Sequence, residues 1–186
     1  MTQSSPAALA AERARRLLEV RRYEDAGKAA MEGLQNEPNN AMLLGLLAMA
    51  LDGEGRFHDA RMWSERSLGV DPQQAWVHNL RATAILDGAG SPQEAIQSAY
   101  AAVQLDQFDT SYRYTLTRAY LLAGNRSDAQ TIARSIRGVD PNSTLGPLAE
   151  ALVEIDRARF LKIHPVWAVI AVVLTRGFAL VIWAVI

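Results

Sequence analysis

The sequence predicts an all-α protein: an α-solenoid of about four helix-turn-helix repeats, followed by a capping helix and one C-terminal transmembrane helix. Three observations lead to this prediction. Short sequence blocks recur at intervals of 34 or 35 residues, an amphipathic stretch follows the last block, and residues 165–186 hold a single charge. A repeat of this length is one supersecondary unit that cannot bury its apolar face alone, so neighbouring units must stack.

The blocks begin near residues 23, 57, 92 and 126, and the same residue types recur in each. A small residue lets two helices approach closely, a glycine permits the left-handed end of a helix, and an acid–proline pair ends one helix and starts the next. The shared alanines are Ala26, Ala60, Ala95 and Ala129. Twelve residues later stand Pro38, Pro72, Gln107 and Pro141, each after an acid, and five residues before each alanine stand Arg21, Gly55, Gly90 and Gly124.

This period and pattern resemble the tetratricopeptide repeat over roughly residues 7–143. The resemblance implies an array over 6–143, with units at about 6–40, 41–74, 75–109 and 110–143. Three departures stand out: Arg21 replaces a glycine, the third unit holds one extra residue and lacks the proline, and the bulky aromatic residue often found early in the first helix is missing. They weaken single units and leave the register intact.

The resemblance also implies a concave groove, lined by the first helix of each unit, that holds an extended or helical peptide. Methionine suits an adaptable binding surface, and tryptophan, tyrosine and arginine are enriched among binding hot spots. The alternative for some of these residues is packing between repeats. The predicted groove residues are Arg15, Met42, Met49, Trp76, Asn79, Thr83, Tyr114 and Arg118, with Gly45, Asp52, Leu86 and Ser111 on the same faces. Among these, we expect the Asn79 amide to hold a peptide backbone and Arg118 to hold a carboxylate.

Two segments flank the array. We expect residues 1–5 to be a disordered N-terminal tail. Residues 144–163 predict a capping or juxtamembrane helix, because Leu148, Leu152 and Ile155 lie at helical spacing between polar residues. The alternative is a continuous helical stalk that runs into the membrane, and Pro165 favours a break instead.

Residues 165–186 predict a transmembrane helix, since 22 residues span roughly 33 Å and a hydrocarbon core is about 30 Å thick. The segment contains 12 Val, Ile, Leu or Phe residues, whose insertion outweighs the cost of Arg176. Basic residues precede it, so the positive-inside rule places the repeats in the cytoplasm, and we expect a bacterial inner membrane. The predicted interface anchors are Arg157, Arg159, Lys162, Trp167 and Trp183.

Arg176 lies at the middle of this segment. One interpretation is that it pairs with a polar group on a partner membrane helix. The alternatives are that its side chain snorkels to the interface, or that it marks a break between two short interfacial segments.

The composition narrows the classes of function. The chain has no cysteine, which excludes disulfides and thiolate chemistry, and its net charge of −1 does not favour nucleic-acid binding. His58, His78 and His164 are far apart in sequence, and Asp106 and Asp109 suit helix ending and capping. We therefore expect no enzyme activity, no metal and no cofactor.

These observations predict a membrane-anchored adaptor that binds a peptide or protein partner in its groove and a lipid bilayer through 165–186. Two alternatives remain open at this stage. One is a soluble co-chaperone with its apolar tail buried in a dimer or in its own groove. The other is the regulatory N-terminal domain of a larger polytopic membrane protein.

Overall fold

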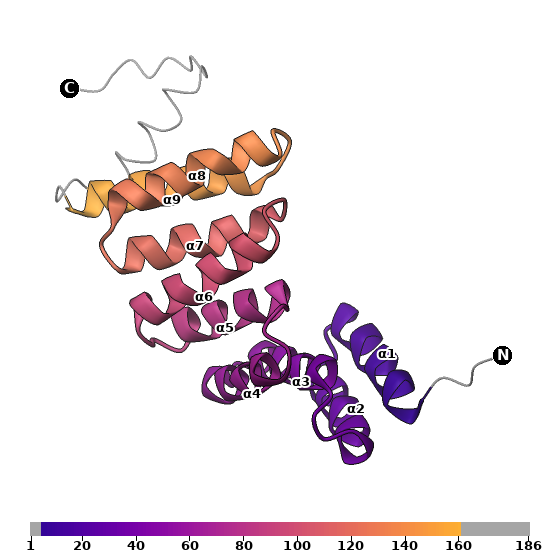
Figure 1. Cartoon of the computed structure of the whole chain (residues 1–186). Coiled ribbons are helices and arrows are strands. Elements are labelled where there is room, and N and C mark those ends of the chain that lie inside the picture. The colour runs from indigo at the N-terminus through magenta and orange to yellow at the C-terminus, as the bar shows by residue number, and fades with distance from the viewer. Residues whose placement is uncertain (1–4, 161–186) are drawn as a thin grey trace, which may run out of the picture.

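The protein is an all-α repeat solenoid in the computed structural model, which describes residues 5–160 (Figure 1). This range forms helices joined by short turns and contains no strand. The predicted fold class is therefore confirmed for the repeat array. The helices are α1 (Pro6–Glu19), α2 (Tyr23–Asn36), α3 (Ala41–Gly53), α4 (Phe57–Val70), α5 (Ala75–Asp87), α6 (Pro92–Leu105), α7 (Thr110–Leu122), α8 (Arg126–Val139) and α9 (Leu145–Phe160).

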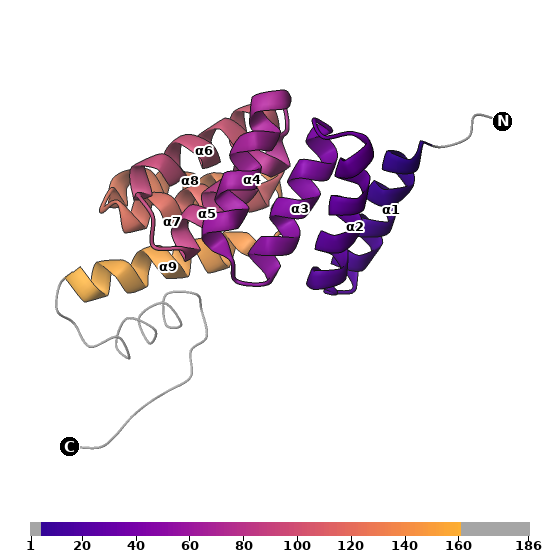
Figure 2. The ribbon, with the colours of Figure 1, turned by 90° about the horizontal axis from the view of Figure 1, so that it is seen from below.

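The helices form two layers. Each helix packs against the next one along the chain, and the odd-numbered helices also contact one another in the order α1, α3, α5, α7 and α9. Across residues 5–160 the backbones of the even-numbered helices stay further apart, and no two of these helices are direct packing neighbours. The odd-numbered helices therefore form a continuous inner layer, with α1 at one end of the stack and α9 at the other (Figures 1 and 2).

The shared alanines are fully buried. Ala26, Ala60, Ala95 and Ala129 are all 0% exposed, as expected for small side chains in tightly packed helix contacts. Around these positions the core is built from leucine, isoleucine, valine and further alanines of adjacent units.

The turn between units depends on the acid more than on the proline, which corrects the predicted role of that pair. Pro38, Pro72 and Pro141 lie in the turn and not in the first turn of the following helix. Asp71 and Asp140 each accept a hydrogen bond from the backbone N–H two residues later, at 2.9 Å. Asp106 makes the same bond to the N–H of Phe108, so the third unit keeps its turn without a proline.

In the third unit, the prediction of which residue ends the first helix in a left-handed backbone conformation is also corrected. Arg21, Gly55 and Gly124 have positive φ, as the register predicted, but the fourth such residue is Ala89 (φ 54°) and not Gly90. The Gly90 N–H instead closes the helix end by donating to the Ile85 carbonyl at 2.7 Å. The extra residue of this unit therefore lies after the helix end, where a loop accommodates it.

Helix α9 covers the C-terminal end of the stack. Ala149 and Val153 pack against Ile136 of α8, and two ion pairs, Arg137–Glu150 at 3.0 Å and Arg126–Asp156 at 2.6 Å, join the helices. The predicted apolar stripe is wrong in register: Leu148 is 47% exposed, and Leu152 and Ile155 are half-buried. The sequence spacing was helical, but the small side chains one position further along fit the narrow space above α8.

No helix between Ser5 and Phe160 has both the length and the apolarity needed to cross a bilayer. The predicted transmembrane helix over 165–186, with Trp167, Arg176 and Trp183, lies outside the described residues, as does Lys162. Arg157 is exposed near the end of α9. At the N-terminus, Ser5 caps α1 by accepting a hydrogen bond from the Ala8 N–H at 3.1 Å, so the helix begins at Pro6.

Candidate functional site

A pocket of about 420 Å³ lies on the inner layer at its N-terminal end. Four of the predicted groove residues come together here, from three different helices. Most of the pocket surface is apolar, and the charged groups at its edge belong to α1. Its lining is Arg15, Leu18 and Glu19 of α1, Met42, Leu46 and Met49 of α3, and Trp76 of α5.

The position of the Trp76 ring depends on Gly45. A Cβ atom at residue 45 would overlap the outer carbons of the Trp76 ring and press on Val77. The glycine therefore allows the indole to lie against the backbone of α3, where it forms one wall of the pocket. Trp76 is half-buried, so part of its ring is available to a ligand.

The pocket edge is polar on the α1 side. The Arg15 guanidinium is exposed and places Nη2 3.7 Å from the Met42 sulfur. Glu19 is exposed one helical turn later. A ligand side chain that enters the pocket would thus pass a flexible charged edge before it reaches leucine, methionine and tryptophan.

Asp52 lies one turn beyond Met49, at the end of α3. One of its carboxylate oxygens, Oδ1, is buried, and no hydrogen-bond donor in residues 5–160 reaches it. Burial, with a further contribution from the nearby Asp87 carboxylate, raises the pKa of Asp52 to about 6. The equivalent position in the next two units is leucine (Leu86 and Leu121), so Asp52 replaces an apolar residue of the repeat.

Asn79 of α5 and Arg118 of α7, the two polar residues expected to hold a ligand, differ in whether the protein already gives them a partner. Asn79 has a buried side-chain oxygen that receives no hydrogen bond from residues 5–160. Arg118 forms an ion pair with Asp87 at 2.6 Å. The predicted role of Arg118 as a binder of a ligand carboxylate therefore competes with a partner that the protein already supplies.

The remaining predicted groove residues are more engaged in the fold. Thr83 donates its hydroxyl to the Leu80 carbonyl, and Ser111 bonds to the Asp109 carboxylate that caps α7. The prediction that Leu86 faces the groove is corrected, because its side chain is buried in a core cluster. Tyr114 is half-buried and packs partly against the cluster below α9.

Sequence reasoning missed three residues of the pocket: Leu18, Glu19 and Leu46. Leu46 could have been found, since it lies four residues after Met42 and three before Met49 on the same helical face. The two α1 residues could have been found in the same way, since they lie three and four residues after Arg15 on one helical face.

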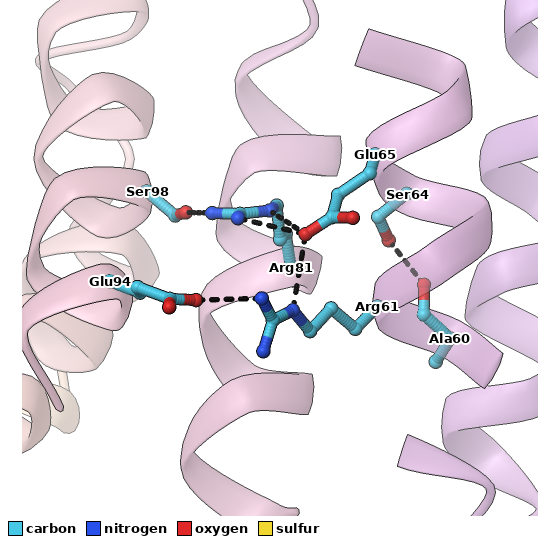
Figure 3. Close-up of polar contacts among 7 residues, drawn as sticks. All are labelled: Ala60, Arg61, Ser64, Glu65, Arg81, Glu94 and Ser98. Carbon is cyan, nitrogen blue, oxygen red and sulfur yellow. Dashed lines mark hydrogen bonds and ion pairs between the residues drawn. The ribbon is translucent and has the colours of Figure 1, made fainter. Parts of the chain in front are cut away.

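The outer layer holds a polar network where α4 and α6 face each other across α5 (Figure 3). The Arg81 guanidinium reaches Glu65 at 2.9 Å on one side and the Ser98 hydroxyl on the other. Arg61 bonds to the same Glu65 oxygen at 3.1 Å and pairs with Glu94 at 2.8 Å. Burial alone would raise the pKa of Glu65, but its bonds to Arg61 and Arg81 outweigh burial and lower it.

The register shows that this network is specific to the middle of the array. The position of Arg81 is occupied by Leu47 in the preceding unit and by Leu116 in the following one. At the Leu47 position a second pocket, of about 580 Å³, opens between α2 and α4. Trp63, Met31 and Leu51 line it, and Arg66 lies 5.2 Å from the Trp63 ring.

The described part of the chain offers no arrangement for metal chemistry. No group of three or more metal-ligating side chains is found there. His78 contacts the Pro72 carbonyl at 3.0 Å through Nε2, and His58 is exposed.

The fold and the inner pocket define the class of protein: a tetratricopeptide-like α-solenoid. No protein-family model matches the sequence, and no curated protein matches it. Among solved structures, a crystal structure of MamA is 15% identical with a TM-score of 0.70, and the match covers 96% of this chain and 98% of MamA. MamA 41-end from Desulfovibrio magneticus RS-1 is 17% identical with a TM-score of 0.73, covering 96% and 100%.

A third neighbour is YrrB, described as a TPR protein with an unusual peptide-binding site. It is 14% identical with a TM-score of 0.68, and the match covers 89% of this chain and 84% of YrrB. At these identities the likeness establishes the shared fold.

Proposed function

We propose that this protein is a non-enzymatic interaction scaffold that binds a peptide or protein segment in its concave groove. The observation that carries the proposal is the apolar pocket in which Met42, Met49 and Trp76 meet. Its volume of about 420 Å³ is enough for one or two large side chains and too small for a folded domain. A partner would therefore insert an anchor residue and lie along the inner layer.

Two further facts support this proposal. The similar structure of YrrB is described as having a peptide-binding site. In this chain, the pocket is lined by the adaptable and aromatic residue types that dominate binding hot spots.

A double substitution tests the groove. With the full chain as bait, Trp76→Ala plus Tyr114→Ala should lower the capture of bound partners about 30-fold or more, as expected for the loss of hot-spot side chains. The matched control is Trp63→Ala, which removes a half-buried tryptophan from the outer layer. Partner capture that is unchanged by the double substitution, or lost equally in the control, would contradict the groove assignment.

We further propose that residues 165–186 anchor the scaffold, with its repeats at the cytoplasmic face of a membrane and Arg176 available to a partner membrane helix. The support is the apolar composition of the segment and the basic residues before it. We expect the full chain to stay in the membrane pellet after alkaline carbonate washing and a chain that ends at Lys162 to be soluble. A full chain that washes off would overturn the anchor and favour a soluble co-chaperone.

A further inference from the structure

We propose that the ligand of the groove is an apolar segment that carries one lysine or arginine, and that its cation pairs with Asp52. This inference rests on the proposed groove function and adds the chemical class of the ligand.

The charges of the groove point to a cationic ligand. Asp87 is neutralised by Arg118 at 2.6 Å, and the exposed Arg15 and Glu19 lie on the same helix at the pocket edge. Asp52 differs from these groups, because its Oδ1 atom is buried and meets no donor from residues 5–160. A ligand therefore gains the most binding free energy by neutralising the Asp52 carboxylate.

Burial makes this site more demanding than a surface carboxylate. A buried acceptor without a donor destabilises the protein, and an ionised donor forms a shorter and stronger hydrogen bond than a neutral one. The Asn79 oxygen is a second buried acceptor of the groove without a donor from the described helices. A guanidinium or ammonium group supplies the charge-assisted donor that the partly exposed Asp52 carboxylate lacks.

The same arrangement explains why the ligand must also be apolar. Asp52 lies three residues after Met49, hence on the same face of α3 as the pocket lining. A ligand with a large apolar side chain in the pocket therefore places a neighbouring cation beside Asp52. An acidic ligand is disfavoured, because the Asp52 carboxylate repels it and Arg118 is already paired with Asp87.

The register adds an independent argument. Leucine occupies the Asp52 position in the next two units, and Leu86 is part of a core cluster there. Packing alone would be served by leucine at residue 52 as well. The aspartate therefore departs from the repeat in a unit that contributes three of the seven residues lining the pocket.

The experiment measures peptide binding to the full chain in detergent micelles by fluorescence anisotropy. The probes are soluble, labelled alanine–serine peptides that carry one leucine and one arginine, with the spacing between them varied. Two matched peptides replace the arginine with citrulline, which is uncharged, or with glutamate. The protein variants are Asp52→Asn, Trp76→Ala and, as a control acid on an exposed face of α8, Asp128→Asn.

We expect the arginine peptide to bind about tenfold more tightly than the citrulline peptide, and Asp52→Asn to abolish that difference without weakening the citrulline peptide. Asp128→Asn should change neither affinity. Equal binding of the arginine and citrulline peptides, still sensitive to Trp76→Ala, would overturn the cationic ligand and leave the groove function intact. If no peptide binds in a Trp76-dependent way, the groove function itself fails, and this inference fails with it.

Discussion

Replacing Val153 with aspartate should detach α9 from the array and lower the free energy of unfolding of the C-terminal unit by about 4 kcal/mol or more. Val153 is 5% exposed and packs on Ile136, so the change removes apolar burial and leaves a buried charge without a partner. Urea denaturation followed by circular dichroism measures the effect. Because each unit contacts only its neighbours, an early separate transition of the last helices is expected instead of a shift of the whole curve.

Leu148→Asp is the matched control for this prediction. It introduces the same side chain on the same helix, five residues earlier, at a position that is 47% exposed. Its denaturation curve should match that of the unchanged protein within about 0.5 kcal/mol. If both substitutions are equally harmless, α9 does not stabilise the stack as a cap.

The second large effect is a gain of stability. Asp52→Leu should raise the free energy of unfolding at pH 7 by about 1–2 kcal/mol, since it removes a carboxylate that burial and Asp87 hold at a pKa of about 6. This figure is roughly half of what the pKa difference alone implies, because part of the carboxyl group meets solvent. Leu86 and Leu121 show that leucine fits the repeat at this position.

The same substitution should change how stability depends on pH. Below the ordinary aspartate value of 3.8, the Asp52 carboxyl is neutral in both the folded and unfolded states and costs nothing. Between that value and about pH 6 the unfolded chain loses the proton first, so the contribution of Asp52 to the stability of the unchanged protein falls as the pH rises. Urea melts across this window should show that fall, and Asp52→Leu and Asp52→Asn should both remove Asp52's contribution to it.

An exposed acid provides the control for the pH series. Asp128→Asn on α8 should leave the fall between about pH 4 and 6 in place, because the residue is in contact with solvent. A pH profile that is the same with and without the Asp52 carboxyl would show that the group is solvated in solution. Read together with the peptide experiment, a stabilised Asp52→Asn protein that has lost its preference for arginine would identify a residue kept for binding at the expense of stability.

Much of the site was predictable because the repeat copies its own geometry. Arg15, Met42, Met49 and Trp76 were all assigned to the groove from the register, and the structure places them around one pocket. Leu86 was assigned by the same rule and is buried instead. The register gives the face of a helix only to within about one residue, and neighbouring helices decide which side of that face is covered.

The wrong predictions share a physical origin, because each depends on a loop or helix next to the one whose spacing was used. Gly90 was expected to be the left-handed residue, but the extra residue of its loop moved that role to Ala89. Leu148 had the right spacing for a core position, yet the space above α8 accepts Ala149 and Val153. Arg118 was expected to bind a ligand carboxylate, but in the structure it lies 2.6 Å from Asp87 on another helix.

The sequence by itself determined the helical class, the repeat period and the order of the units, because these follow from local spacing and from turn chemistry within a few residues. Only the tertiary structure decided where the pocket opens, that Trp76 lies on Gly45, and that Asp52 is left without a donor among the described residues. Those features depend on side chains from different units meeting across the inner layer. Their distances are set by helix packing, which no single stretch of sequence encodes.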